Sequence, residues 1–151
     1  MLNTAKAAAQ ASVILLGLLS AGCGSVQPEQ LNEGSAMSIH YLEIVTENVD
    51  EVCGLYETAH GLYFGPETAA MGQARLATRP DGSMVGVRRP LAEHEQPIVR
   101  TYVAVEDIDQ AVRAAEAAGA MTAYPPTAQG DYGSFAIVIQ GDVQHGLWQR
   151  P

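Results

Sequence analysis

The sequence predicts an α+β domain made of two βαβββ modules. The first reason is an internal repeat, because the run Tyr41–Asp50 returns 59 residues later as Arg100–Asp109. The second reason is that each copy leads into a helical pattern that stops at a glycine, Gly61 or Gly119. The third reason is that each half has room for three more short strands after its helix.

In the first module, the opening strand starts at Tyr41 and is followed by a helix over Asp50–His60. Pro80–Gly82 is a typical turn sequence and separates the last two strands. The three strands after the helix are predicted over Leu62–Phe64, Gln73–Thr78 and Met84–Arg89.

The second module repeats this order. Its opening strand contains Tyr102, its helix covers Asp109–Ala118, and Gly141–Asp142 forms the turn before the last strand. The three strands after the helix are predicted over Met121–Tyr124, Ser134–Gln140 and Gln144–Gln149.

Residues 1–22 have the features of an export signal. Lys6 precedes the apolar stretch Ala7–Leu19, which suits a signal sequence and is too short to span a membrane comfortably. Small residues then lead to Cys23, as in the lipobox that this segment resembles, that of bacterial lipoproteins. The resemblance implies cleavage before Cys23 and attachment of diacylglycerol and a fatty acid such as palmitate. Ser20 stands where the lipobox has leucine, so an ordinary secretory signal with Cys23 as a bystander stays open.

Residues 23–37 are rich in Gly, Ser, Gln, Asn and Glu and are expected to be a flexible tether, with the folded domain over 38–151. Gly24, rather than Asp, follows Cys23, which resembles the outer-membrane default of Gram-negative lipoproteins. The formal net charge of −9 disfavours nucleic acid and direct attraction to anionic lipid. We therefore expect any membrane attachment to be covalent or mediated by the leader. Cys53 lies in an apolar helical stretch and is expected in the core.

Four sequence motifs resemble the vicinal oxygen chelate (VOC) superfamily, which contains glyoxalases, bleomycin-resistance proteins and extradiol dioxygenases. The resemblance covers about Ser38 to Gln149. It implies that each module curls into a half-barrel and that the pair encloses a cavity. The superfamily includes lyases, isomerases, dioxygenases and pure binding proteins, so the resemblance indicates the fold better than the activity. The motifs are His40–Asp50, Tyr102–Asp109, Phe135–Ile139 and His145–Gln149.

The metal-dependent members of this superfamily place His or Gln on the first strand of a module and Glu on the last. The matching positions here are Tyr41, Gly86, Arg100 and Gly146. Glycine has no ligating side chain, and arginine is a permanent cation that repels a metal ion. Glu43 alone cannot supply the three or four ligands that a divalent ion needs. The sequence therefore predicts no classical metal site and no cofactor, with a divalent metal as the disfavoured alternative.

Strand alternation predicts which side chains face the cavity. Two arginines, one carboxylate and three aromatic rings suit a small organic ligand that is flat or anionic. A simple ion pair between Glu43 and Arg100 is the competing interpretation. The predicted pocket residues are Tyr41, Glu43, Arg88, Arg100, Tyr102, Gln144 and Trp148.

These observations favour an envelope protein that is lipid-anchored outside the cytoplasm and binds a small molecule without metal chemistry. Sequestration of a toxic compound, as in the resistance branch of the superfamily, is a role that such a protein would have. The first alternative is a lyase, isomerase or dioxygenase that uses Glu43 with His40 or His145. A metal-free version of this enzyme would use Glu43 as base and Tyr41 or Tyr102 as proton donor. The second alternative is an envelope interaction module with a vestigial pocket. A homodimer is left open.

The remaining histidine positions favour structural roles. By strand parity, His40 and His145 face the helix side. His60 precedes the helix-ending glycine and is expected in the core or at its boundary. His94 lies in the acidic connector Glu93–Glu95, which is expected to be a solvated loop rather than a surface metal site.

Overall fold

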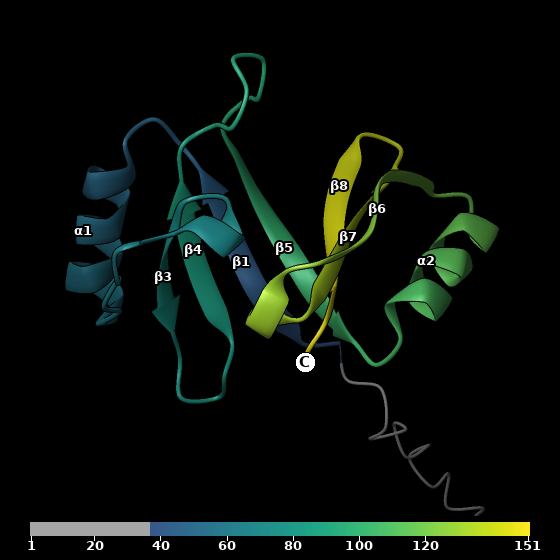
Figure 1. Cartoon of the computed structure of the whole chain (residues 1–151). Coiled ribbons are helices and arrows are strands. Elements are labelled where there is room, and N and C mark those ends of the chain that lie inside the picture. The colour runs from purple at the N-terminus through teal and green to yellow at the C-terminus, as the bar shows by residue number, and fades with distance from the viewer. Residues whose placement is uncertain (1–36) are drawn as a thin grey trace, which may run out of the picture. The chain divides into compact units, whose positions relative to one another are not determined.

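The computed structural model describes residues 37–151, so the predicted signal peptide, Cys23 and almost all of the predicted tether lie outside the described residues. The described chain forms two βαβββ modules, as predicted (Figure 1). The first module consists of β1 Ile39–Val45, α1 Val49–His60, β2 Glu67–Thr68, β3 Ala74–Thr78 and β4 Met84–Arg88. The second consists of β5 Ile98–Val105, α2 Ile108–Ala117, β6 Met121–Ala128, β7 Ser134–Gln140 and β8 Val143–Gln149.

All eight strands form one sheet in the order β2-β3-β4-β1-β5-β8-β7-β6. Within each module the first and last strands are parallel neighbours, β1 with β4 and β5 with β8. The modules join where β1 runs antiparallel to β5, with Glu43 opposite Arg100 and Tyr41 opposite Tyr102. The repeat detected in the sequence is thus a repeat in the sheet, with Glu43 beside Gly86 in one half and Tyr102 beside Gly146 in the other.

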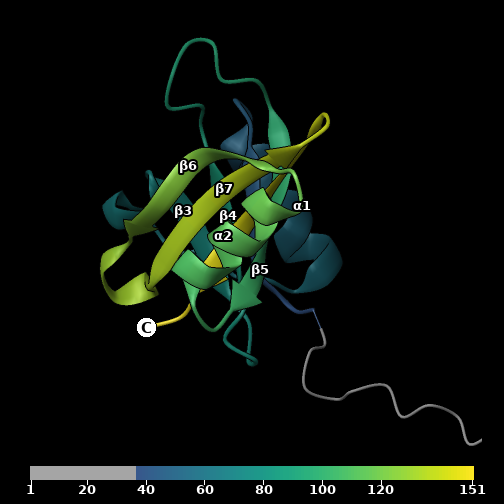
Figure 2. The same ribbon diagram turned by 90° about the vertical axis from the view of Figure 1, so that its right-hand side faces the viewer.

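The sheet bends at the β1–β5 junction, so that the two half-sheets face each other. Helix α1 lies on the outer side of one half and α2 on the outer side of the other (Figure 1). Turning the molecule shows α2 lying across the strands of the second module, where it contacts β6, β7 and β8 (Figure 2). Helices on the outside leave the inner faces free to form a separate interior.

The helix boundaries follow local signals in the sequence. Helix α1 ends at Gly61, whose φ of 65° is the left-handed conformation that glycine adopts without steric cost. Helix α2 begins after Asp107, whose side chain accepts a hydrogen bond from the Gln110 backbone N–H at 2.8 Å. Neither helix within residues 37–151 is long and apolar enough to cross a membrane.

Apolar side chains form three clusters. The first lies between α1 and its half-sheet and contains Cys53, which is buried as predicted. The second lies between α2 and the other half-sheet, around Ile108 and Val112. The third lies on the inner faces of both half-sheets and includes Tyr41, Tyr102 and Trp148. The inner cluster is therefore built by both modules together.

One predicted strand is wrong. Leu62–Phe64 forms an irregular segment, and the strand of this region is the two-residue β2, Glu67–Thr68. Leu62 and Phe64 are apolar because they pack against the α1 cluster, not because they alternate along a strand. The Phe64 carbonyl accepts a hydrogen bond from Arg75 Nη2 at 3.4 Å instead of joining a ladder.

Candidate ligand-binding site

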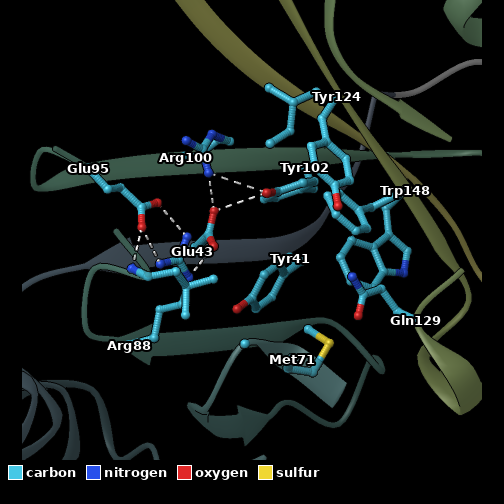
Figure 3. A pocket seen from close by; sticks show the side chains of 14 residues that line it. Tyr41, Glu43, Met71, Arg88, Glu95, Arg100, Tyr102, Tyr124, Gln129 and Trp148 are labelled. Atoms are coloured by element: carbon cyan, nitrogen blue, oxygen red, sulfur yellow. Dashed lines mark hydrogen bonds and ion pairs between the residues drawn. The ribbon is translucent and has the colours of Figure 1, made fainter. Parts of the chain in front are cut away.

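A cavity of about 320 Å³ lies between the facing inner surfaces of the two modules (Figure 3). Aromatic and aliphatic side chains form most of its wall, and one end is polar, because two arginines and two carboxylates meet there. The lining consists of Tyr41, Glu43, Met71, Gly72, Arg88, Leu91, Glu95, Arg100, Tyr102, Tyr124, Gln129, Phe135, Ile137 and Trp148. Both modules and the connector between them contribute, so the cavity exists only when the modules are joined.

Glu43 is the centre of the polar end. Arg88 Nε donates to Glu43 Oε1 at 2.8 Å, and Arg100 Nη1 donates to Glu43 Oε2. The Tyr102 hydroxyl donates to the same Oε2 at 3.0 Å. The three charged side chains are only 6–7% exposed, so each depends on the others for compensation of its charge. The donors come from β4 and β5, which are the two neighbours of β1 in the sheet.

Arg88 has a second carboxylate partner. Its Nη1 and Nη2 donate to Glu95 Oε2 and Oε1 at 2.9 and 2.7 Å, the paired arrangement that arginine and carboxylate prefer. Glu95 Oε2 also accepts the Leu91 backbone N–H at 2.7 Å. The pKa of Glu95 is lowered to about 2. The main cause is hydrogen bonding from Arg88, and the hydrogen bond from the Leu91 backbone has a smaller effect in the same direction. The expectation that Glu93–Glu95 is a solvated loop is therefore wrong for Glu95.

Arg100 is held on three sides. Besides Glu43, its Nη2 donates to Gln144 Oε1 at 3.0 Å, and its Nη1 lies 3.4 Å from the Tyr102 hydroxyl. Gln144 itself is exposed and does not line the cavity, unlike the six other predicted pocket residues. Among the described residues, Arg100 Nε is the one buried side-chain polar atom without a hydrogen-bond partner.

The aromatic wall is one connected cluster. Trp148 lies 5.2 Å from Tyr41 and 5.5 Å from Tyr102 between ring centroids, and it stacks on Phe135 at 6.0 Å. Phe135 in turn stacks on Tyr124 at 5.1 Å. Trp148 is fixed in place because its Nε1 donates to the Tyr132 carbonyl at 2.8 Å. The rings therefore present a rigid surface to any ligand.

The two tyrosine hydroxyls differ in their partners. Tyr102 donates to Glu43, whereas the Tyr41 hydroxyl lies over Gly86 of β4 and has no hydrogen bond to the residues drawn (Figure 3). Burial, and next the charge of Glu43, raise the pKa of both phenols well above the ordinary value. Both hydroxyls are thus protonated at neutral pH, and that of Tyr41, a lining residue, is a donor without a hydrogen bond to the residues drawn in Figure 3.

The residues of this interior do not fit a classical VOC metal site. Two of the four positions are Gly86 and Gly146, and the Tyr41 and Tyr102 rings fill the space beside them. A third position is Arg100, which is ion-paired with Glu43. Within residues 37–151, no group of three or more His, Cys, Asp or Glu side chains converges. The site therefore lacks the set of donors that a divalent ion requires.

The histidines lie outside the cavity lining. A bulge in β1 between Ile39 and Tyr41 places His40 beside Trp148, 5.8 Å between ring centroids, rather than on the helix side. Arg150 Nε donates to His40 Nδ1 at 3.1 Å, and burial, followed by the charge of Arg150, lowers the pKa of His40. His40 is therefore neutral at pH 7, and its Nδ1 is already an acceptor.

The other three histidines have structural or solvent-facing settings. His145 is half-buried on β8 opposite Val138, and neither it nor His94, which is exposed, lines the cavity. His60 is exposed at the end of α1, with its ring edge against Tyr56, so the expectation of a core or boundary position is wrong. The metal-dependent arrangement of Glu43 with His40 or His145 is not assembled in this structure.

Eight lining residues were not predicted from the sequence. Tyr124, Phe135 and Ile137 belong to strands whose inward face could have been found by alternation. The others lie in turns or in the connector, which have no periodicity, so only the course of the chain brings them to the cavity. These five are Met71, Gly72, Leu91, Glu95 and Gln129.

No protein-family model matches the sequence, and no curated protein matches it either. Solved structures do match. A hypothetical protein from Bacillus halodurans has a TM-score of 0.62 at 13% identity, covering 78% of this chain and 96% of that one. Methylmalonyl-CoA epimerase from Mycobacterium tuberculosis has a TM-score of 0.60 at 16% identity, covering 75% of this chain and 87% of that one.

A mutant 4-hydroxymandelate synthase from Streptomyces coelicolor has a TM-score of 0.59 at 19% identity. The match covers 75% of this chain and 38% of that longer one. The epimerase and the synthase both have the VOC fold, so the predicted fold class, α+β with two βαβββ modules, is confirmed. At these identities the likeness extends to the fold alone.

Proposed function

We propose that this domain binds a small, flat organic molecule in the cavity between its two modules, without a classical metal site. The observation that carries the proposal is the cavity itself, which combines a continuous aromatic wall with a polar end and an unengaged tyrosine hydroxyl. A volume of about 320 Å³ lies at the lower end of the range of small-molecule sites. The ligand that fits is therefore of the size of one or two aromatic rings.

The charges at the polar end favour a neutral ligand in the arrangement observed. The positive charges of Arg88 and Arg100 are offset by the negative charges of Glu43 and Glu95. An anion that approached without moving any of the four would add an uncompensated charge to a largely dry site. A neutral ring with one hydrogen-bond acceptor can instead stack on Trp148 and accept from the Tyr41 hydroxyl.

The same proposal includes lipid attachment at Cys23 and a location in the cell envelope, outside the cytoplasm. It is supported by the apolar stretch Ala7–Leu19 and the small residues before Cys23. Acyl chains of this kind anchor a protein stably, because each buried methylene contributes about 0.8 kcal/mol. The domain would then act on compounds that reach the membrane surface, and sequestration of such a compound is the role that fits best.

Fluorescence of the cavity tryptophan provides the test, because Trp148 is the only tryptophan of the whole chain. The full chain in a non-aromatic detergent is titrated with small neutral aromatics such as benzyl alcohol, indole and benzamide. We expect saturable changes in Trp148 emission. Ile137→Phe, which narrows the cavity, should abolish them, whereas the exposed β8 substitution Val143→Phe should not. A response that is identical in both variants would contradict the proposal.

Elemental analysis tests the metal part of the proposal. The full chain, purified without chelators, should contain no stoichiometric divalent metal. A metal ion that is present at one per chain and lost in Glu43→Gln or His145→Ala would overturn the metal-free reading. Glu47→Gln, at an exposed carboxylate that does not line the cavity, is the matched control.

An enzyme is the second candidate, because two of the similar structures are an epimerase and a synthase. The metal-free version would need Glu43 as a base, yet three donors from Arg88, Arg100 and Tyr102 already occupy its oxygens. Tyr41 is the better placed group, as a proton donor to a bound ligand. Turnover of a bound aromatic, lost in Tyr41→Phe with binding retained, would favour the enzyme over the binding protein.

An interaction module with a vestigial pocket is the third candidate. An open cavity lined by both modules disfavours it, since a pocket without a ligand is expected to fill with side chains.

A further inference from the structure

We infer that the Arg88 end of the cavity is a carboxylate site that Glu95 fills from within the chain, and that an aromatic carboxylate binds there by displacing Glu95. The inference rests on the proposed binding function. It adds a second class of ligand, which reaches Arg88 by displacing Glu95. It starts from the fact that Arg88 has two carboxylate partners of different kinds.

The first partner holds Arg88 in place. Glu43 accepts from Arg88 Nε at 2.8 Å, lies on β1 and is bound in addition by Arg100 and Tyr102. Its position is set by the strand pairing of the sheet, where Glu43 lies beside Gly86 of β4 and opposite Arg100 of β5. The Arg88 guanidinium therefore keeps its orientation whether or not its other two nitrogens are engaged.

The second partner binds the two terminal nitrogens of Arg88, of which Nη1 also donates to the Arg89 carbonyl at 3.0 Å. Both oxygens of Glu95 accept from Arg88 Nη1 and Nη2, at 2.9 and 2.7 Å. This paired geometry is the one that a free carboxylate adopts on arginine. Glu95 also lines the cavity, as does Arg88, so the site that Glu95 fills opens on the space proposed for the ligand.

Glu95 is held mainly by its own connector. Among residues 37–151, its carboxylate is hydrogen-bonded to Arg88 and the Leu91 backbone alone, and its backbone N–H donates to the Ala92 carbonyl at 2.9 Å. This connector, residues 89–97, contains no helix or strand, and it projects from the junction of β4 and β5 (Figure 1). Glu95 can therefore leave Arg88 with the connector while every ladder of the sheet stays intact.

Because of the charges around Arg88, Glu95 must be replaced by another anion and cannot simply leave. Without Glu95, the buried group of Arg88, Arg100 and Glu43 carries one net positive charge. A net positive charge in this interior is costly, so Glu95 leaves only when another carboxylate replaces it. A monoanion restores the balance of charge, which a dianion would not.

The aromatic wall determines which class of carboxylate can displace Glu95 from Arg88. Glu95 is tethered close to Arg88 in sequence, and a tether of this length corresponds to an effective concentration on the order of millimolar or more. A small aliphatic acid competes poorly against it. A ring that stacks among Tyr41, Tyr102 and Trp148 supplies the additional binding free energy. The ligand class is therefore an aromatic monocarboxylate.

The test compares benzoate with the neutral benzyl alcohol, using Trp148 emission of the full chain in a non-aromatic detergent. Glu95→Ala removes the internal competitor, and Glu95→Gln removes its charge with little change in size. Glu93→Ala, an exposed site on the same connector, is the matched control. We expect Glu95→Ala to bind benzoate roughly ten- to a hundredfold more tightly than the wild type. Benzyl alcohol affinity should change by less than about threefold, and Glu93→Ala should behave as the wild type.

The outcomes separate the two proposals. If benzyl alcohol binds but benzoate affinity is the same in the wild type and Glu95→Ala, the carboxylate site is refuted and the binding function stands. If neither compound alters Trp148 emission in any variant, both proposals fail. Should Glu95→Ala not fold, Glu95→Gln decides, because loss of the charge must strengthen benzoate binding in the same direction. Unchanged benzoate affinity in a folded Glu95→Gln protein refutes the inference.

Discussion

The Tyr102 ring lies directly against the backbone of Gly146, at a distance that excludes any side chain at position 146. A similar relationship occurs in the first module, where the hydroxyl end of the Tyr41 ring lies against Gly86. In both cases a Cβ atom on the glycine would overlap the tyrosine ring. The glycines at two of the usual metal positions are therefore not merely missing ligands, because they make room for the two rings that form the cavity wall.

This relationship predicts that Gly86→Ala and Gly146→Ala are destabilising. Each added methyl group displaces a ring of the inner cluster, and overpacking of this kind costs about 1–3 kcal/mol of unfolding free energy. Urea denaturation of the two variants measures the loss. Gly54→Ala is the control, because a Cβ at that helical position meets no atom within 4 Å. It should stabilise the protein by about 0.5–1 kcal/mol, and a similar gain at Gly146 would contradict the packing described.

The two cavity tyrosines should respond differently to removal of the hydroxyl. Tyr102→Phe loses the hydrogen bond to the Glu43 carboxylate, and we expect a loss of about 1.5–3 kcal/mol in unfolding free energy. Tyr41→Phe should change the unfolding free energy by less than about 0.5 kcal/mol, because that hydroxyl has no hydrogen bond to the residues drawn in Figure 3. Equal losses in both variants would show that the Tyr41 hydroxyl has a partner of its own.

The sequence was sufficient for the module order and for the inward side of the central strands. Both depend on local regularity: the repeat aligns β1 with β5, and alternation places Tyr41 and Glu43 on one face and Leu42 and Ile44 on the other. The bulge that moves His40 toward Trp148 breaks this regularity, and nothing in the local pattern indicates it.

Glu95 shows why the cavity residues of the connector could not be predicted from the sequence. Its triplet with Glu93 and His94 has the composition of a solvated loop, and two of the three residues are exposed as that composition suggests. Glu95 differs because its side chain meets Arg88, the last residue of β4. Such a contact depends on the course of the chain in three dimensions. Alternation along β4 therefore predicts that Arg88 faces inward, but it does not predict that Glu95 binds Arg88.

Acid should weaken the fold through Glu95. Its pKa is lowered from 4.5 to about 2 in the folded state, so its ion pair with Arg88 contributes fully above pH 4.5 and is lost as the pH falls to about 2. The whole contribution is about 3 kcal/mol at most. Unfolding free energy measured against pH should therefore fall more steeply in the wild type than in Glu95→Gln. Glu93→Gln should follow the wild-type curve, and a Glu95→Gln curve that does the same would exclude this source of acid sensitivity.

Cys23 is expected to control membrane attachment. Cells that are given a radioactive or clickable palmitate should label the wild-type protein and not Cys23→Ala. The variant should lack the label whether its leader is retained or cleaved, because no lipid is attached in either case. Cys53→Ala is the matched control, since Cys53 is buried in the α1 cluster and burial raises its thiol pKa. Label that persists in Cys23→Ala would show that the palmitate is attached to another residue, and the proposed attachment at Cys23 would be wrong.

Glu43 should be the most sensitive position of the polar end. In Glu43→Gln, Arg88 keeps Glu95, but Arg100 loses its only carboxylate and remains buried with Gln144 and Tyr102 as neutral partners. Leaving a buried charge uncompensated costs about 3–5 kcal/mol. Glu47→Gln removes an exposed ion pair with Arg89 and should cost less than about 1 kcal/mol. Unfolding free energies from urea denaturation make the comparison. Combining Glu43→Gln with Arg100→Met removes the stranded charge, and the double variant should recover part of the loss. No recovery would mean that Glu43 stabilises the fold through Arg88 and Tyr102 rather than through Arg100.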